Sequence, residues 1–147
     1  MVQKFLVVAA LILTGFSYDD TFAHSGATGI VKERMDYFKA SSRDLKKIRT
    51  HINNETYALI IPLAKSMATW SAKMPDYFPA GSNIKPSEAA PKIWSDFESF
   101  TAAARLNWEA TMSLARAAKK GDRASVITAF KETAASCKSC HKTYRLK

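Results

Sequence analysis

One short stretch near the end of the chain constrains its fold more than any other: Cys137-Lys138-Ser139-Cys140-His141. Cys-x-x-Cys-His is the attachment signature of a c-type haem. If the stretch is helical, positions i, i+3 and i+4 lie on one face. The two thiols can then add to two vinyl groups on one porphyrin edge, while the imidazole points at the iron as its proximal ligand. We therefore predict one covalent haem c, held by Cys137, Cys140 and His141.

Three other interpretations of the Cys-x-x-Cys pair compete with haem attachment. A thioredoxin-like redox pair is expected inside a βαβ pattern, and no such pattern surrounds it. A zinc site needs further ligands, but these are the only two cysteines in the chain. Two cysteines three positions apart on a helix also make a poor structural disulfide. The motif therefore favours haem.

The position of the motif bears on the second axial ligand of the iron. Only six residues follow His141, and none of them is Met or His. A sixth ligand would therefore have to come from upstream. This argues against the plan of the common small cytochromes c, which attach haem near their start and supply a Met from later in the chain.

Residues 1–23 have the pattern of an export signal. Lys4 gives a positive start, Phe5–Phe16 is an apolar run, and Thr21-Phe22-Ala23 is a plausible cleavage site. The run is 12 residues long, whereas a membrane-spanning helix needs about 20. We predict that residues 1–23 are removed and that residues 24–147 form one periplasmic haem domain.

The chain is basic, with a formal net charge of +9. Removal of Lys4, Asp19 and Asp20 with the signal raises it to +10. The simplest interpretation is a solvated surface that keeps the protein soluble. For an exported protein we expect no nucleic-acid partner. An unidentified acidic redox partner would also fit, since charge steers encounter more than it sets affinity.

Apolar residues recur at helical spacing in four segments, approximately residues 29–53, 61–73, 91–118 and 123–144. Breaks separate them: Asn53-Asn54-Glu55, a Pro-rich loop over residues 75–90, and a Lys119-Lys120-Gly121-Asp122 turn. Strict alternation, the mark of a strand, is absent. The pattern predicts an all-α protein, an antiparallel four-helix bundle with the haem attached on its last helix.

The third segment has the clearest periodicity, and we expect Trp94, Phe97 and Trp108 to be buried on its packing seam. The predicted seam comprises Trp94, Phe97, Thr101, Ala104, Trp108, Thr111, Ala115 and Ala118, and Ile93, Phe100 and Leu114 widen the stripe. On the last segment the predicted core stripe comprises Ile127, Phe130, Ala134, Cys137, His141 and Tyr144. The haem-binding residues would therefore face the core.

The sequence from Cys137 to Arg145 resembles the C-terminal signature of the class II c-type cytochromes, which include cytochrome c′ and the low-spin cytochromes c-556. Three further stretches are similar to this family: Val31–Asp36, Phe78–Ser82 and Pro91–Trp94. The resemblance covers residues 24–147. It implies a left-twisted four-helix bundle, a periplasmic haem and often a homodimer packed through the first two helices.

The same resemblance suggests what lies on the open face of the iron. Low-spin members supply a Met four residues after an Arg of the first helix, and that Arg matches Arg34. The ligand position is then Phe38, which matches the non-ligating side chain of cytochrome c′. Arg34 would lie near the haem edge, although on a basic protein it could equally be a surface arginine. Met35, one turn away, is the alternative sulfur ligand if the helix rotates.

No Ser/His/Asp set, carboxylate pair or phosphate-binding loop stands out, so we do not expect an enzyme. The sequence predicts an exported monohaem cytochrome that transfers electrons, binds a small gas such as NO or CO at an open sixth site, or does both. The alternative is a low-spin, six-coordinate electron carrier of the cytochrome c-556 type that uses a Met such as Met35.

Overall fold

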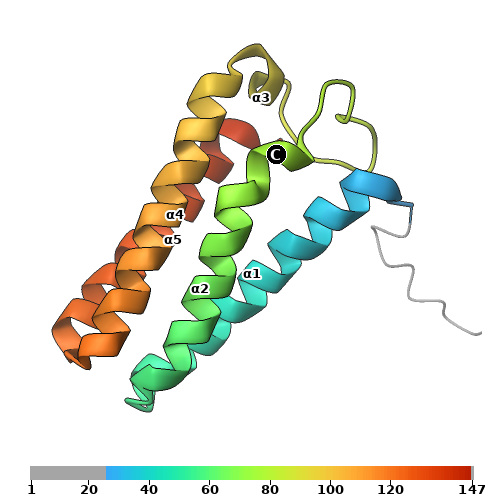
Figure 1. The fold of residues 1–147 in the computed structure, drawn as a ribbon. Coiled ribbons are helices and arrows are strands. Elements are labelled where there is room, and N and C mark those ends of the chain that lie inside the picture. Colours follow the sequence, from blue (N-terminus) through green and yellow to red (C-terminus); the bar gives the residue numbers. More distant parts are fainter. Residues whose placement is uncertain (1–25, 147) are drawn as a thin grey trace, which may run out of the picture.

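The computed structural model describes residues 26–146 (Figure 1). The predicted export signal, residues 1–23, lies outside the described residues. Four long helices make up the fold: α1 (Gly29–Asn53), α2 (Ile60–Lys73), α4 (Phe97–Lys120) and α5 (Arg123–Tyr144). Three short helices join them: η1 (Tyr57–Leu59), η2 (Met74–Tyr77) and α3 (Lys92–Ser95). Within residues 26–146, no helix is both long and apolar enough to cross a membrane.

The long helices form an antiparallel four-helix bundle, as predicted (Figure 1). Contacts between α2 and α4 and between α4 and α5 are extensive, those between α1 and α2 are fewer, and α1 touches α5 at few points. The bundle is therefore least closed where α1 faces α5, and a cavity lies on this side.

The turn between α4 and α5 lies where the sequence predicts it, at Gly121 and Asp122. Gly121 ends α4 with a left-handed backbone, φ 74°, which costs glycine little because it has no Cβ. Asp122 caps α5, and its side chain accepts a hydrogen bond from the Ser125 amide at 2.8 Å. This short turn makes α4 and α5 adjacent and antiparallel.

The third predicted helix is not continuous. The chain leaves helical geometry at Asp96, with φ −147° and ψ 61°, so that α3 and α4 are separate helices. Asp96 then caps α4 by accepting a hydrogen bond from the Ser99 amide at 3.3 Å. The apolar periodicity runs through this break unchanged, which is why the break was missed.

The predicted seam of this helix is also wrong in part. Phe97 and Trp108 are 41% and 40% exposed, and Trp94 is only half-buried. The buried positions of α4 lie about one residue further round the helix: Phe100, Ala104, Asn107, Thr111, Leu114, Ala115, Ala117 and Ala118. The polar Asn107 lies inside this set, and a pattern built on apolar residues assigns such a position to the surface.

Helix α5 shows the same small rotation. Ile127, Phe130 and Ala134 are half-buried, whereas Val126, Ala129 and Thr133 are buried. Tyr144 is buried, as predicted. The error is one residue position, about 100° on a helix. In the motif, Cys137 is half-buried and His141, predicted to face the core, is exposed.

Two apolar clusters fill the bundle. The first lies toward the α1–α2 and α4–α5 turns and is aliphatic. The second lies at the α3 end and is largely aromatic: Trp70, Met74, Phe78, Ile93, Phe100, Ala104 and Tyr144. Phe38 and Cys140 pack against this second cluster, so the haem motif borders the aromatic half of the core.

Candidate functional site

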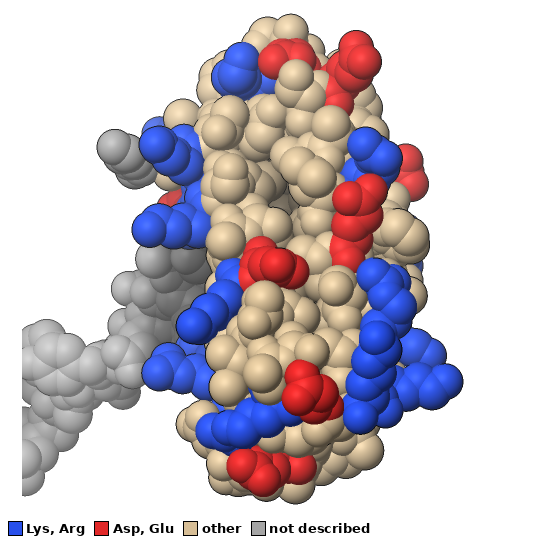
Figure 2. Space-filling view, turned by 90° about the vertical axis from the view of Figure 1, so that its left-hand side faces the viewer, with Lys and Arg blue, Asp and Glu red and all other residues tan. Residues whose placement is uncertain are grey.

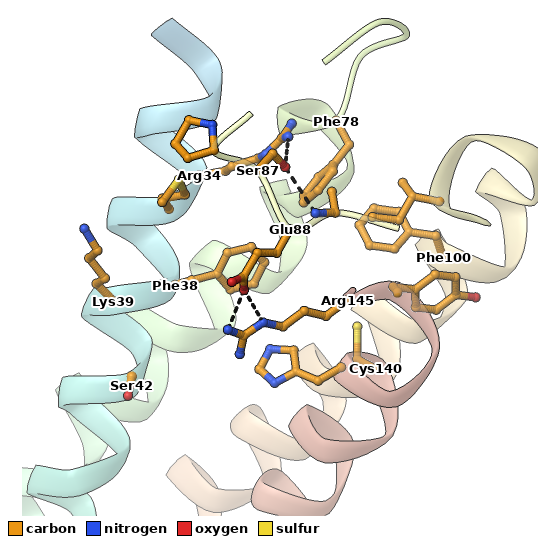
Figure 3. Close-up of a pocket in the computed structure, with 16 residues that line it drawn as sticks. Arg34, Phe38, Lys39, Ser42, Phe78, Ser87, Glu88, Phe100, Cys140 and Arg145 are labelled. Atoms are coloured by element: carbon orange, nitrogen blue, oxygen red, sulfur yellow. Dashed lines mark hydrogen bonds and ion pairs between the residues drawn. The ribbon is translucent and has the colours of Figure 1, made fainter. Parts of the chain in front are cut away.

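A cavity of about 330 Å³ lies between α1 and α5, beside the aromatic cluster. Its walls come from α1, from the loop that follows η2, from α3 and α4, and from the last turn of α5. In Figure 3, Phe38 reaches in from α1 while Cys140 and Arg145 border the space from the α5 side. Residues far apart in the sequence therefore meet around one mainly apolar space.

The three motif residues lie together on α5. Cys140 and His141 line the cavity, whereas Cys137 lies one turn earlier and contacts Asn107 of α4. Both cysteines are unpaired and half-buried. Burial raises the pKa of the Cys137 thiol, and it raises the pKa of Cys140 to about 11. Both are therefore neutral thiols near pH 7.

His141 and Phe38 face each other across the cavity. Their ring centroids are 6.4 Å apart and their planes are inclined by 67°. The imidazole is accessible through the open cavity, yet partial burial lowers its pKa, and the nearby Arg145 cation lowers it further. The neutral imidazole, the form that can donate a lone pair to a metal, is therefore favoured.

Arg34 is buried, with 2% of its surface exposed, so a surface arginine is excluded. Its guanidinium donates to the Tyr77 and Ser82 carbonyls and to the hydroxyls of Ser82 and Ser87. It also stacks over Phe78, with 4.4 Å between Cζ and the ring centroid. All these partners are neutral. Burial lowers the pKa of Arg34, and its charge still lacks an anionic partner among them.

The loop after η2 lines the cavity and is hydrogen-bonded both to α1 and to the end of α5. Arg34 of α1 holds it through Ser82 and Ser87. At the end of α5, Arg145 Nε donates to Glu88 Oε2 at 2.7 Å, and the Leu146 amide donates to the Glu88 carbonyl at 2.8 Å. Sequence reasoning treated this loop as a connection and missed Ser87 and Glu88, because hydroxyl and acidic residues in a Pro-rich loop carry no distinctive pattern.

The donor set fits a c-type haem. Two neutral thiols one helical turn apart can add to two vinyl groups, and one neutral imidazole beside the second thiol can bind the iron. Aromatic walls suit the faces of a porphyrin, and the buried Arg34 cation suits a porphyrin carboxylate. Met35 lines the same cavity, so a sulfur atom is also near. Among residues 26–146, no group of three or more His, Cys, Asp or Glu side chains could hold a metal ion.

Comparisons with known proteins identify the family to which the chain is similar. The family model described as cytochrome c′ matches residues 29–145. A cytochrome c′ from Rhodospirillum rubrum is 28% identical over 149 residues, which cover 97% of this chain and 98% of that protein. A cytochrome c-556 from Agrobacterium tumefaciens is 46% identical over 83 residues, or 56% of this chain and 66% of that protein.

Solved structures resemble the bundle as a whole. A nitric oxide complex of a variant of cytochrome c prime from Alcaligenes xylosoxidans has a TM-score of 0.71 and 28% identity, and the match covers 80% of this chain and 94% of that chain. The cytochrome c′ of Thermochromatium tepidum, at 23% identity, has a TM-score of 0.73. The family match spans most of the chain and includes the whole haem motif, so this chain belongs to the cytochrome c′ family of class II c-type cytochromes.

Proposed function

We propose that this chain is an exported monohaem cytochrome in which His141 binds the iron, Cys137 and Cys140 hold the porphyrin, and the sixth coordination site is open. Members of this family carry one covalent haem c. The observation that carries the proposal is the position of Phe38, opposite His141 across the cavity. A phenyl ring has no lone pair for iron, yet it fills space on the face where a sixth ligand would bind.

Each residue then has a defined task. Haem supplies a reversible ferric–ferrous change and a site for diatomic gases. Cys137 and Cys140 would hold the porphyrin through two thioether bonds, each formed by addition of the S–H across a vinyl group, so that nothing is released. His141 would bind the iron through a ring nitrogen, and the Arg34 guanidinium would offer its charge to a porphyrin carboxylate. Phe38 excludes water and bulky ligands while leaving room for a small gas.

Some relatives support the proposal and others support its alternative. Structures of cytochrome c prime from Alcaligenes xylosoxidans include complexes with nitric oxide and with carbon monoxide, which supports NO or CO as a ligand here. The cytochromes c-556 among the relatives support the alternative, a low-spin electron carrier. Met35 would then have to supply the sulfur, since it lines the cavity near Phe38.

The proposal extends to location and partners. The export-signal pattern of residues 1–23 supports a periplasmic protein. Its task would be electron transfer or gas binding instead of enzyme catalysis, with an unidentified redox protein as partner and a homodimer as the assembly that the family resemblance suggests.

Figure 2 shows the face of α4 and α5, where Lys and Arg gather along both edges and uncharged and a few acidic side chains fill the middle. Positive charge on this face is therefore spread out.

The absorption spectrum of the purified ferrous protein tests this function, recorded before and after addition of carbon monoxide. An open site predicts a high-spin, five-coordinate spectrum that changes to a low-spin form when the gas binds. A ferrous protein that is already low-spin and does not respond to carbon monoxide, with a Met–iron signal by NMR, would favour the c-556 alternative.

A further inference from the structure

Asn107 is a polar side chain in the interior of the bundle, 9% exposed, midway along α4. Its amide oxygen is 2.5 Å from the Ser71 hydroxyl of α2. Its amide nitrogen donates to the Ser136 hydroxyl at 2.7 Å and to the Cys137 sulfur at 3.4 Å, both on α5. One amide therefore joins three helices at the first attachment cysteine, behind the cavity.

The neighbours of Asn107 determine which way its amide faces. Ser136 already donates its hydroxyl hydrogen to the Thr133 carbonyl at 2.8 Å, so toward Asn107 it can only accept. A thioether sulfur at Cys137 has no hydrogen and can also only accept. Both therefore require the NH₂ group. The Ser71 hydroxyl then meets the amide oxygen, to which it can donate.

Stability alone does not require an amide at this position. Without Asn107, the Ser71 hydroxyl can donate to the Met67 carbonyl, which lies 3.0 Å away. Ser136 keeps its bond to the Thr133 carbonyl. A leucine of similar size would thus leave no hydroxyl hydrogen without a partner, and replacing buried polar groups by apolar ones of the same shape can be nearly neutral. The Cys137 sulfur, in contrast, loses the hydrogen bond that the Asn107 amide donates to it.

We propose that Asn107 is a positioning residue for the haem, acting through an N–H···S hydrogen bond to the Cys137 thioether that holds this attachment point and raises the reduction potential. The inference rests on the proposed attachment of haem through Cys137. The positive end of the N–H dipole points at a sulfur bonded to the porphyrin edge. In a buried, low-dielectric setting such a dipole favours the ferrous form, which carries one more electron.

The test compares holoproteins that carry Asn107→Leu, Asn107→Asp or Ser71→Ala. The Leu variant removes the donor to sulfur, and the Asp variant keeps an acceptor for Ser71 but replaces the NH₂ group with oxygen. Ser71→Ala is the matched control, because it removes the partner of the amide oxygen and leaves both hydrogen bonds of the NH₂ group. Spectroelectrochemistry gives the midpoint potential, and resonance Raman spectroscopy gives the carbon–sulfur stretching bands.

The proposal predicts a lower midpoint potential and a shifted carbon–sulfur band in both Asn107 variants, with both quantities unchanged in Ser71→Ala. If Asn107→Leu fails to fold, the carbon–sulfur band of Asn107→Asp decides, because a buried carboxylate charge lowers the potential by itself. Equal potentials and bands in an Asn107 variant and the parent would overturn the inference. Peptide mass mapping of the parent separates the two claims: a Cys137 peptide without haem refutes the proposed attachment, while a haem-bearing Cys137 with unmoved potentials refutes only the role of Asn107.

Discussion

At the scale of single residues, the cavity is defined by two positions on α1, four residues apart. Arg34 points into the loop region and is fully buried by it, while Phe38 points across the cavity toward His141. The family resemblance identified both positions from sequence. Their surroundings were not predictable, because the neutral hydrogen-bond partners of Arg34 come from a loop 43 to 53 residues away along the chain.

Phe38→Met should convert the ferrous iron from high-spin to low-spin, because a thioether at this position can donate the lone pair that phenyl lacks. The absorption spectrum reports the change.

Phe38→Ala should instead speed carbon monoxide binding in stopped-flow measurements by opening the same face. Met35→Leu is the control for both, since it removes the neighbouring sulfur and should leave the parent spectrum unchanged. Loss of a low-spin parent spectrum in Met35→Leu would instead identify Met35 as the ligand.

At the scale of the helices, periodicity located all four long segments, and two local signals, Gly121 and Asp122, located a turn correctly. Periodicity placed Phe97 on the seam of α4 and Phe100 at its margin, whereas in the structure Phe100 is buried and Phe97 is exposed. Both are aromatic and three residues apart, so a count of apolar residues scores them alike. Asn107, which hydrogen-bonds to α2 and α5, lies on the buried face with Phe100, and a pattern of apolar residues does not count it.

The corrected seam makes Phe100 a core residue and Phe97 a peripheral one, at 2% and 41% exposure. Phe100→Ala should therefore lower the free energy of unfolding by about 3–5 kcal/mol, the usual cost of truncating a buried Phe. Phe97→Ala, its matched control, should cost much less. Denaturant titration of the two holoproteins measures both. Equal losses would show that the seam runs between the two rings.

The cap at the start of α5 should make stability depend on acid. Hydrogen bonds from Ser125 lower the pKa of the Asp122 carboxyl in the folded chain. The stabilisation is therefore present above its ordinary pKa of 3.8 and is lost as the pH falls through the lower folded value. Asp122→Ala should reduce the melting temperature at neutral pH. Asp122→Asn keeps a side-chain oxygen that can accept the hydrogen bond. It should therefore retain most of the parent's melting temperature at neutral pH and lose the part of the stability that depends on acid. An identical acid response in Asp122→Asn and the parent would assign that response to other carboxylates.

At the scale of the whole molecule, helix packs against helix on three sides of the bundle, and on the fourth side the loop after η2 connects α1 with the end of α5. Arg34 and Arg145 fasten this loop to α1 and to the end of α5, which themselves touch little. The fold class and the haem motif were predictable because both are local in sequence: the helical periodicity recurs along the chain, and the motif is a single short stretch. The closure was not, since it depends on single polar contacts between distant segments.

The central claim is that the mature chain carries one haem bonded to Cys137 and Cys140. The intact mass of the protein purified after export tests it most directly, combined with peptide mapping. Because each thiol adds to a vinyl group without a leaving group, the account predicts the mass of residues 24–147 plus one whole haem. This mass should survive acid-acetone extraction, and both cysteines should map to the haem-bearing peptide. Haem that extracts freely, leaving the bare chain mass with two free thiols, would contradict the account.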